Sequence, residues 1–493
     1  MRKYFLTFII LSFSGICFCE VKVPLDSPHL QNTSYSFYAK YINGEEIISI
    51  NPRLRLTPAS TIKLFTTATA VAALDADKTF ETKIYYDGVI NFWDTLNGNI
   101  YIQGGGDPAL GSDRIKDNAD MRTVLDRWTA EIKALGVKKI NGNIYADTSL
   151  FGGLSLPPKT PWEDMGNYYG ATADALSIND NSFTIYLKPQ PIEGAIVEID
   201  TITPAVDGLQ VSSMITASAP SEPASVYAFG APNQFNVMLY GTIPAGKADY
   251  LAASLPNPPL FAAQELKKAL KAAGVKVTGN TKLITLPVSY EGKNLLLTQT
   301  SPTVGQIINI INKKSFNLYS EVMLKQLGAI LGKEGSTKEG IEVIKVFLEA
   351  NQISAEDFLI YDGSGLARDN FTNTYTVVSL LEAMHSHEDF EVFYNSLIIP
   401  GLDEDEKRFT RVFAGTAADK NLHLKTGYMS SVRAYSGYIN DKNGRMIAFS
   451  FIVNNYTSKT AEINNIFNKL IIALANLQET KTTKPAIKNA AKN

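Results

Sequence analysis

Alternating apolar and polar residues mark strands near both ends of the chain. Segments 34–42 and 45–50 alternate around Asn43-Gly44, a dipeptide that favours a tight hairpin turn. A second pair, 432–439 and 445–453, flanks a polar turn, and apolar residues at helical spacing then run from about 458 to 477. Because both ends of the chain supply strands, we expect them to share one antiparallel sheet.

The middle of the chain has a different pattern, in which helices alternate with short strands. The segments that start at Leu96 and Ile140 share the letters NGNIY, and those that start at Ala130 and Glu265 share a helix, a Gly-Val stop and a strand. These echoes indicate small α/β units within an insertion, or else a convergence of common turn and helix signals. The spacing is too irregular for a solenoid. The Pro- and Ala-rich stretch 189–259 is predicted to be mostly β.

The first 19 residues have the pattern of a secretory signal peptide. Two basic residues precede an apolar run that is short for a membrane span, and Cys17 and Cys19 take the small-residue positions before a cleavage site at Glu20. A membrane anchor and a lipid-modified cysteine are the alternatives. Cleavage after Cys19 would leave a mature chain without cysteine, and therefore without disulfides, a thiol nucleophile or thiolate metal ligands.

Charge and composition exclude several function classes. The formal net charge is −3, and nothing in the sequence suggests a nucleic-acid partner. No other stretch is apolar enough for a transmembrane anchor in the mature chain. The histidines lack zinc-binding spacing, so we expect no metal and no cofactor. The lysine-rich segment 479–493 is predicted to be a disordered tail.

Ser60 and Lys63 open an apolar helical pattern. Thr57 suits a helix cap and Pro58 suits the first helical position, which would place Ser60 in the first turn. Residues three apart share a helix face, so a neutral lysine could take the proton of the serine hydroxyl and activate it as a nucleophile. Ser-x-x-Lys arises by chance about once or twice in a chain this long, so a capped surface helix is the alternative.

Two further short motifs lie far along the chain. Ser315 and Asn317 stand at a junction between helical segments, where the hydroxyl could relay a proton and the amide could hold a substrate carbonyl. Lys425, Thr426 and Gly427 precede the second hairpin, where an edge strand could bind a substrate carboxylate. Taken singly, the alternatives are a helix cap and an exposed strand lysine.

In this order and on these elements, the three motifs resemble the motif set of the penicillin-binding protein and serine β-lactamase superfamily. The gap of about 250 residues between the first two motifs is far longer than β-lactamases show. The chain therefore resembles the low-molecular-mass class C penicillin-binding proteins, which form the D-alanyl-D-alanine carboxypeptidase/endopeptidase family. The landmarks of this resemblance are segments 104–108, 147–149, 161–165, 169–171 and 362–368, the last reading DGSGLAR.

The resemblance implies an α+β, multidomain fold. A transpeptidase-like catalytic domain, with an antiparallel sheet and helices, would carry two inserted smaller domains. We expect the catalytic domain to comprise 20–80 and 296–478. A largely β insertion would comprise 81–105 and 180–295, with a nested α/β insertion at 106–179.

The resemblance also implies a role for each motif residue. Ser60 would be acylated, with Lys63 as its base. Ser315 would pass a proton to the leaving amine, and Asn317 would orient the peptide. The substrate carboxylate would be held by Lys425 and its neighbour Thr426.

Further binding residues follow from the same family pattern. The backbone N–H groups of Ser60 and Tyr428 would form an oxyanion hole, and Gly427 would let the substrate approach the strand. Asp164, Tyr169 and Arg368 would hold the charged end of the stem-peptide side chain. The chain departs from the pattern at two positions, because Phe316 and Tyr428 are both bulky for their places.

The function implied is that of a serine D-Ala-D-Ala carboxypeptidase of the periplasm. It would act on peptidoglycan stem peptides, have D-Ala–diaminopimelate endopeptidase activity and bind β-lactams covalently. The alternatives are a β-lactamase or esterase on the same fold, and a non-catalytic peptidoglycan-binding protein.

Overall fold

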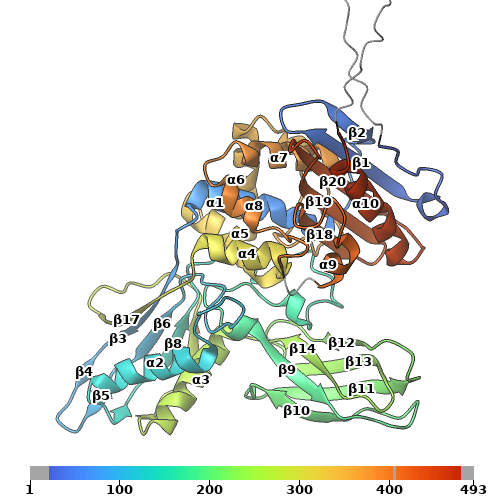
Figure 1. Cartoon of the computed structure of the whole chain (residues 1–493). Helices are drawn as coiled ribbons and strands as arrows, with labels where there is room; N and C mark the ends of the chain where they lie inside the picture. The colour runs from blue at the N-terminus through green and yellow to red at the C-terminus, as the bar shows by residue number, and fades with distance from the viewer. Residues whose placement is uncertain (1–20, 404–406, 479–493) are drawn as a thin grey trace, which may run out of the picture.

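The computed structural model describes residues 21–403 and 407–478, so the predicted signal peptide and tail lie outside the described residues. An upper body contains both ends of the described chain, and two smaller units extend below it (Figure 1). None of the helices in the described ranges is long and apolar enough to cross a membrane.

A five-stranded antiparallel sheet forms the centre of the upper body, in the strand order β18-β19-β20-β1-β2. Strand β1 pairs with β20 along its whole length, from Ser34 opposite Asn454 to Tyr41 opposite Ile447. The sheet expected from the two ends of the chain is therefore confirmed. Its strands are β1 (Ser34–Tyr41), β2 (Glu46–Ile50), β18 (His423–Met429), β19 (Val432–Asn440) and β20 (Met446–Asn454).

Helices cover both faces of this sheet. On one face, Phe467 of α10 (Thr460–Ala475) packs against Phe37 and Phe451, together with α9 (Lys407–Phe413). On the other face, Tyr438 and Ala448 join a core built from six helices. These are α1 (Lys63–Leu74), α4 (Val304–Lys313), α5 (Asn317–Leu331), α6 (Thr337–Ala350), α7 (Thr374–His385) and α8 (Phe390–Asn395).

Helix α1 lies inside this core rather than on the surface. Ten of its twelve residues are buried, and two of its threonines donate to carbonyl groups: Thr66 to the Gly363 carbonyl at 3.1 Å and Thr67 to the Lys63 carbonyl at 2.8 Å. A helix that is apolar on nearly all sides is stable only when protein surrounds it. The alternative of a capped surface helix after Ser60 is therefore wrong.

The chain between α1 and α4 leaves the upper body and returns to it at one point. The Ser301 N–H donates to the Phe80 carbonyl at 2.9 Å, and the Val304 N–H donates to the Lys78 carbonyl at 2.8 Å. The long insertion therefore does not interrupt the packing of the upper body. It folds as the two lower units of Figure 1.

One lower unit is α/β. Helices α2 (Met121–Ala134) and α3 (Pro258–Ala272) pack on two sheets, with Trp128 buried in the shared core. The sheet orders are β16-β8-β6-β3-β17 and β15-β7-β5-β4. The strands are β3 (Glu81–Tyr86), β4 (Val89–Ile90), β5 (Thr95–Asn97), β6 (Ile100–Gln103), β7 (Lys139–Ile140), β8 (Ile144–Asp147), β15 (Lys276–Val277), β16 (Thr281–Ile284) and β17 (Asn294–Thr300).

The NGNIY echoes lie side by side in this unit. Strands β6 and β8 are parallel, with Ile100 opposite Ile144. The side-chain oxygen of Asn99 accepts from the Asn143 N–H at 2.9 Å, and that of Asn143 accepts from the Asn280 N–H at 2.9 Å. The shared letters therefore mark a repeated structural unit, because each asparagine satisfies the backbone of the next repeat.

The other lower unit is β. It contains two three-stranded sheets, in the orders β10-β9-β14 and β11-β13-β12, which confirms the mostly β prediction for this stretch. The strands are β9 (Ser182–Leu187), β10 (Ile199–Thr203), β11 (Gln210–Ser218), β12 (Ser225–Phe229), β13 (Asn236–Pro244) and β14 (Asp249–Ser254).

The strand pairing divides the insertion differently from the predicted boundaries. Segment 106–179 contains α2, β7 and β8, which pair with β5, β6, β15 and β16 in one unit. The nested unit is the β one, formed by β9–β14, and the α/β unit surrounds it in the sequence. The prediction separated β6 from β8, although the repeated asparagines hold these strands together.

Helices α5 and α6 approach so closely that one position requires glycine. A Cβ at Gly340 would lie 2.0 Å from the Leu324 carbonyl oxygen. In Gly340→Ala the gain in helix propensity is about 1 kcal/mol, and overpacking against backbone costs about 1–3 kcal/mol. We therefore expect a lower Tm in thermal denaturation. Lys338→Ala, an exposed change on the same helix, should leave Tm unchanged, and an equal Tm for both variants would contradict the packing account.

Candidate active site

Ser60 lies in a short 3₁₀ helix, Ala59–Ile62 (η2), that runs directly into α1. Ala59 adopts a φ of 47°, in the left-handed region. The predicted cap by Thr57 is wrong. Pro58 takes the cap position in a helical conformation, and the Thr57 hydroxyl instead donates to the Arg368 carbonyl at 3.1 Å.

Lys63 is fully buried, and its amine contacts three oxygen atoms. The Nζ atom lies 3.0 Å from the Ser60 Oγ and 2.7 Å from the Asn317 Oδ1, and it also donates to the Ser364 carbonyl. The amide and carbonyl oxygens can only accept hydrogen bonds, whereas a hydroxyl can donate. A neutral amine would therefore donate to Asn317 and Ser364 and direct its lone pair at the Ser60 hydroxyl.

The charge state of Lys63 follows from its burial. Desolvation lowers the pKa of its ammonium group to about 7, and the negative charges of Glu321 and Asp362 oppose this fall. A large fraction of the amine is consequently neutral near pH 7, as a general base requires.

Glu321 and Asp362 are buried carboxylates that shape the loop facing Lys63. The Glu321 oxygens accept from the N–H groups of Gly363 and Ser364, at 3.0 and 2.8 Å. The Asp362 oxygens accept from the Gly365 and Ala367 N–H groups at 2.9 and 2.6 Å. The Ser364 carbonyl is thereby aimed at the lysine. Burial, followed by the charge of Asp362, raises the pKa of Glu321 to about 7.

Ser315 and Lys425 form a second hydroxyl–amine pair. The Lys425 Nζ donates to the Ser315 Oγ at 2.9 Å and to the Thr426 carbonyl at 2.9 Å. Ser315 has a φ of 54°, a left-handed conformation that is uncommon for residues with a side chain. The helix junction between α4 and α5 thus turns this hydroxyl toward β18.

Strand β18 is the edge of its sheet and passes close to Ser60. A Cβ at Gly427 would lie 2.7 Å from the Pro58 carbonyl oxygen and 3.1 Å from the Ser60 nitrogen, so only glycine fits there. From the neighbouring strand, the buried Arg433 donates to the Gly427 carbonyl at 3.1 Å. Tyr428 follows with its side chain 60% exposed.

Tyr169 and Asp164 continue from Asn317 as a chain of hydrogen bonds. The Asn317 Nδ2 donates to the Tyr169 carbonyl at 2.9 Å, and the Tyr169 hydroxyl donates to the Asp164 Oδ1 at 3.2 Å. Burial raises the pKa of Asp164, and the charge of Arg368 is near enough to oppose the rise. The Arg368 side chain also donates to the Ser430 carbonyl at 3.4 Å.

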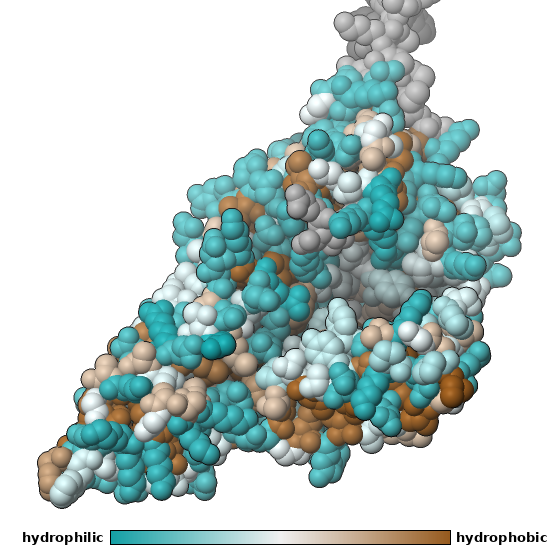
Figure 2. Space-filling model, turned by 60° about the horizontal axis from the view of Figure 1, so that its bottom comes forward, coloured by the Kyte–Doolittle hydropathy of each residue, from teal (hydrophilic) through white to brown (hydrophobic). Residues whose placement is uncertain are grey.

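The structure thus brings the predicted site residues into one neighbourhood, on the underside of the upper body. Viewed from below, the surface is hollowed between this body and the unit that contains β9–β14 (Figure 2). Sequence reasoning missed Glu321 and Arg433. Glu321 stands four residues after Asn317 in a mostly apolar helix whose one other charged residue is Lys325, and a charge at that position was the signal that could have revealed it.

A model described as the D-Ala-D-Ala carboxypeptidase 3 (S13) family matches residues 20–477, nearly the whole chain. The chain belongs to this S13 family. The resemblance drawn from the three motifs is therefore confirmed, as is the activity class, a serine-type D-Ala-D-Ala carboxypeptidase.

Individual relatives agree with the S13 assignment. The chain is 28% identical to a D-alanyl-D-alanine carboxypeptidase of Actinomadura sp. over 84% of its own length and 76% of the relative's. It is 26% identical to D-alanyl-D-alanine carboxypeptidase DacB of Haemophilus influenzae over 92% of both. The crystal structure of penicillin binding protein 4 (dacB) from H. influenzae matches with a TM-score of 0.78 and 25% identity, over 90% of this chain and 96% of that one. The predicted fold class is confirmed.

Lys63 generates a prediction about the pH dependence of this S13 chain. Acylation by a β-lactam should fall about tenfold per pH unit below pH 7, because protonation removes the base. In Glu321→Gln the acid limb should move only slightly, toward lower pH, because the Glu321 carboxyl is itself only partly ionised near pH 7 and loss of that partial charge makes Lys63 somewhat harder to protonate. The maximal rate should also fall, because an amide cannot accept from both loop N–H groups.

The measurement is the acylation rate from pH 5 to 9, with Glu342→Gln on the surface of α6 as the matched control. A flat acid limb in the native protein would contradict a neutral Lys63. An upward shift in Glu321→Gln would contradict the electrostatic role of Glu321.

Proposed function

We propose that Ser60 forms an acyl-enzyme with the D-Ala-D-Ala end of a peptidoglycan stem peptide. The Ser60 Oγ attacks the carbonyl of the penultimate D-Ala while its proton passes to Lys63. The peptide C–N bond then breaks, and the leaving amine of D-Ala takes a proton through Ser315. Water hydrolyses the ester and restores the serine.

One observation carries this proposal, namely the arrangement around the Lys63 amine. Its two other partners accept hydrogen bonds only, so the neutral form has its lone pair free for the Ser60 hydroxyl at 3.0 Å. A buried amine with a lowered pKa and one reacting hydroxyl is suited to general-base catalysis rather than to structural pairing.

Substrate binding is assigned to the edge of β18. A peptide lying along this strand would place its terminal carboxylate near Lys425 and Thr426, as an added strand would. The N–H groups of Ser60 and Tyr428 would then receive the oxyanion, and the close approach at Gly427 brings the two segments together. Recognition of a free carboxylate accounts for the carboxypeptidase specificity.

β-Lactams would acylate the same serine. The H. influenzae protein has been crystallised in complex with a novel β-lactam. In this chain the charge of Glu321 acts on Lys63, but both oxygens of Glu321 are engaged by backbone N–H groups, which leaves it unsuited to activate a deacylating water. We therefore expect a long-lived adduct, whereas rapid penicillin turnover would support the β-lactamase alternative.

We further propose that the protein acts in the periplasm and also cleaves D-Ala–diaminopimelate cross-links. The hollow beside the β9–β14 unit offers room for a second peptide strand (Figure 2). Digestion of defined muropeptides followed by mass spectrometry would separate D-Ala release from cross-link cleavage. Binding without either product would support the non-catalytic alternative.

A labelled penicillin tests the nucleophile. The native protein should form a covalent adduct, and Ser60→Ala should form none while keeping its Tm, because only the attacking oxygen is lost. Ser212→Ala, an exposed serine in β11, should label like the native protein. The proposal fails if the native protein does not label, or if Ser60→Ala still labels.

Asp164 tests the specificity for the stem-peptide side chain. Asp164→Asn should lower kcat/KM about tenfold for peptides whose third residue has a free amine, because a charge-assisted hydrogen bond is lost. Peptides with a neutral third side chain should be affected little. Equal losses for both peptides would contradict the assignment of Asp164 to the amine.

A further inference from the structure

Phe316 stands between Ser315 and Asn317, and its side chain is enclosed by aromatic and cationic groups. The ring is 4% exposed. The guanidinium of Arg114 lies 4.0 Å from its centroid, and Tyr168 stacks near it with centroids 6.1 Å apart and 18° between planes. Tyr319 of α5 meets it edge-on at 5.0 Å. The Phe316 side chain thus fills a space enclosed by Arg114, Tyr168 and Tyr319, behind the motif formed by Ser315 and Asn317.

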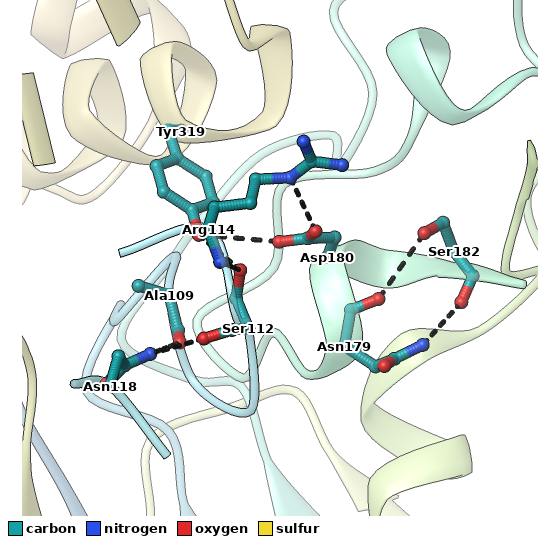
Figure 3. Close-up of polar contacts among 8 residues, drawn as sticks. All are labelled: Ala109, Ser112, Arg114, Asn118, Asn179, Asp180, Ser182 and Tyr319. Atoms are coloured by element: carbon teal, nitrogen blue, oxygen red, sulfur yellow. Dashed lines mark hydrogen bonds and ion pairs between the residues drawn. The ribbon is translucent and has the colours of Figure 1, made fainter. Parts of the chain in front are cut away.

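Arg114 belongs to the insertion and is itself fixed by a polar cluster (Figure 3). Its Nε donates to the Asp180 Oδ2 at 2.6 Å. The buried Tyr319 hydroxyl donates to the Ser112 Oγ at 2.8 Å and lies 3.4 Å from the Asp180 Oδ1. The loop that carries Arg114 is closed by Asn118, whose side chain donates to the Ala109 and Ser112 carbonyls at 2.7 Å each.

The cluster joins three parts of the molecule. Arg114 follows β6 of the α/β unit, Asp180 lies in the short 3₁₀ helix Asn179–Asn181 (η4) directly before β9 of the β unit, and Phe316 and Tyr319 belong to the catalytic body. Ser315, next to Phe316, is in the left-handed region and needs its surroundings to hold it there. Because the Phe316 ring is packed on several sides, it restricts the backbone of its neighbours Ser315 and Asn317.

We propose that Arg114 is a positioning residue for the second motif, acting through Phe316. Its guanidinium, held by Asp180, presses on the ring and keeps the Ser315 hydroxyl at Lys425 and the Asn317 amide at Lys63. The inserted units thereby help to set the catalytic geometry. This inference rests on the proposed roles of Ser315 and Asn317.

The test measures the second-order rate constant for acylation by a labelled penicillin, together with Tm. Arg114→Ala should slow acylation about tenfold or more, because small displacements of catalytic groups have large effects on rate. Arg114→Lys keeps the charge but loses the flat contact with the ring, so its acylation rate should lie between those of the native protein and Arg114→Ala. Arg122→Ala on α2 of the same insertion, with an 89% exposed side chain, should match the native rate.

A double-mutant cycle separates positioning from a general structural role. If Arg114 acts through Phe316, then Arg114→Ala should slow acylation no further in a Phe316→Ala background. The proposal would be overturned if the two substitutions slowed acylation independently, so that their rate factors multiplied in the double variant. It would also be overturned if folded Arg114→Ala were acylated at the native rate. If Arg114→Ala does not fold, a native rate in Arg114→Lys overturns it and a slower rate at unchanged Tm supports it. Failure of the native protein itself to label would instead refute the proposed function.

Discussion

The buried amine of Lys63 is the group around which the catalytic body is organised. It comes from α1, and its partners come from the turn before α1, from the start of α5 and from the loop 362–368. A buried ammonium paired directly with a carboxylate would keep its proton. Here the two nearby carboxylates bind backbone N–H groups of the loop 362–368 instead, and it is the Ser364 carbonyl of this loop that contacts the amine. Backbone groups of the loop therefore separate the negative charges from the amine, which permits a pKa near 7 for Lys63.

This arrangement depends on segments that are distant in sequence. Strand β1 pairs with β20, so both ends of the chain are needed to place β18 beside Ser60. The insertion leaves and rejoins the body between Phe80 and Ser301, and the Arg114 cluster is one of several further contacts with α5. The Asn317 side chain also donates to the Tyr169 carbonyl, and Gln326 donates to the Gly105 and Gly106 carbonyls. Attachments at several separate points restrict rotation of the lower units far more than a single hinge would.

Much of the site could be predicted from the sequence, because its chemistry lies in short motifs whose order is informative. The two hairpins and the helix after them also followed from periodicity alone. What failed were features set by tertiary contacts. The Thr57 hydroxyl donates to the Arg368 carbonyl instead of capping the helix. The predicted domain boundaries placed β6 and β8 in different units, although the two strands are neighbours in one sheet. Glu321 was missed because nothing local shows that its oxygens reach a loop about forty residues away.

The two departures from the family pattern have different physical settings. Phe316 is buried against Arg114, Tyr168 and Tyr319, so its size is matched by neighbours behind the motif and leaves the catalytic side unobstructed. Tyr428 is 60% exposed, and the Arg433 guanidinium lies 5.9 Å from its ring. A side chain with so little packing can move at small cost when a substrate arrives. Variation at position 316 is therefore constrained by the fold, whereas variation at position 428 can alter which substrates the cleft accepts.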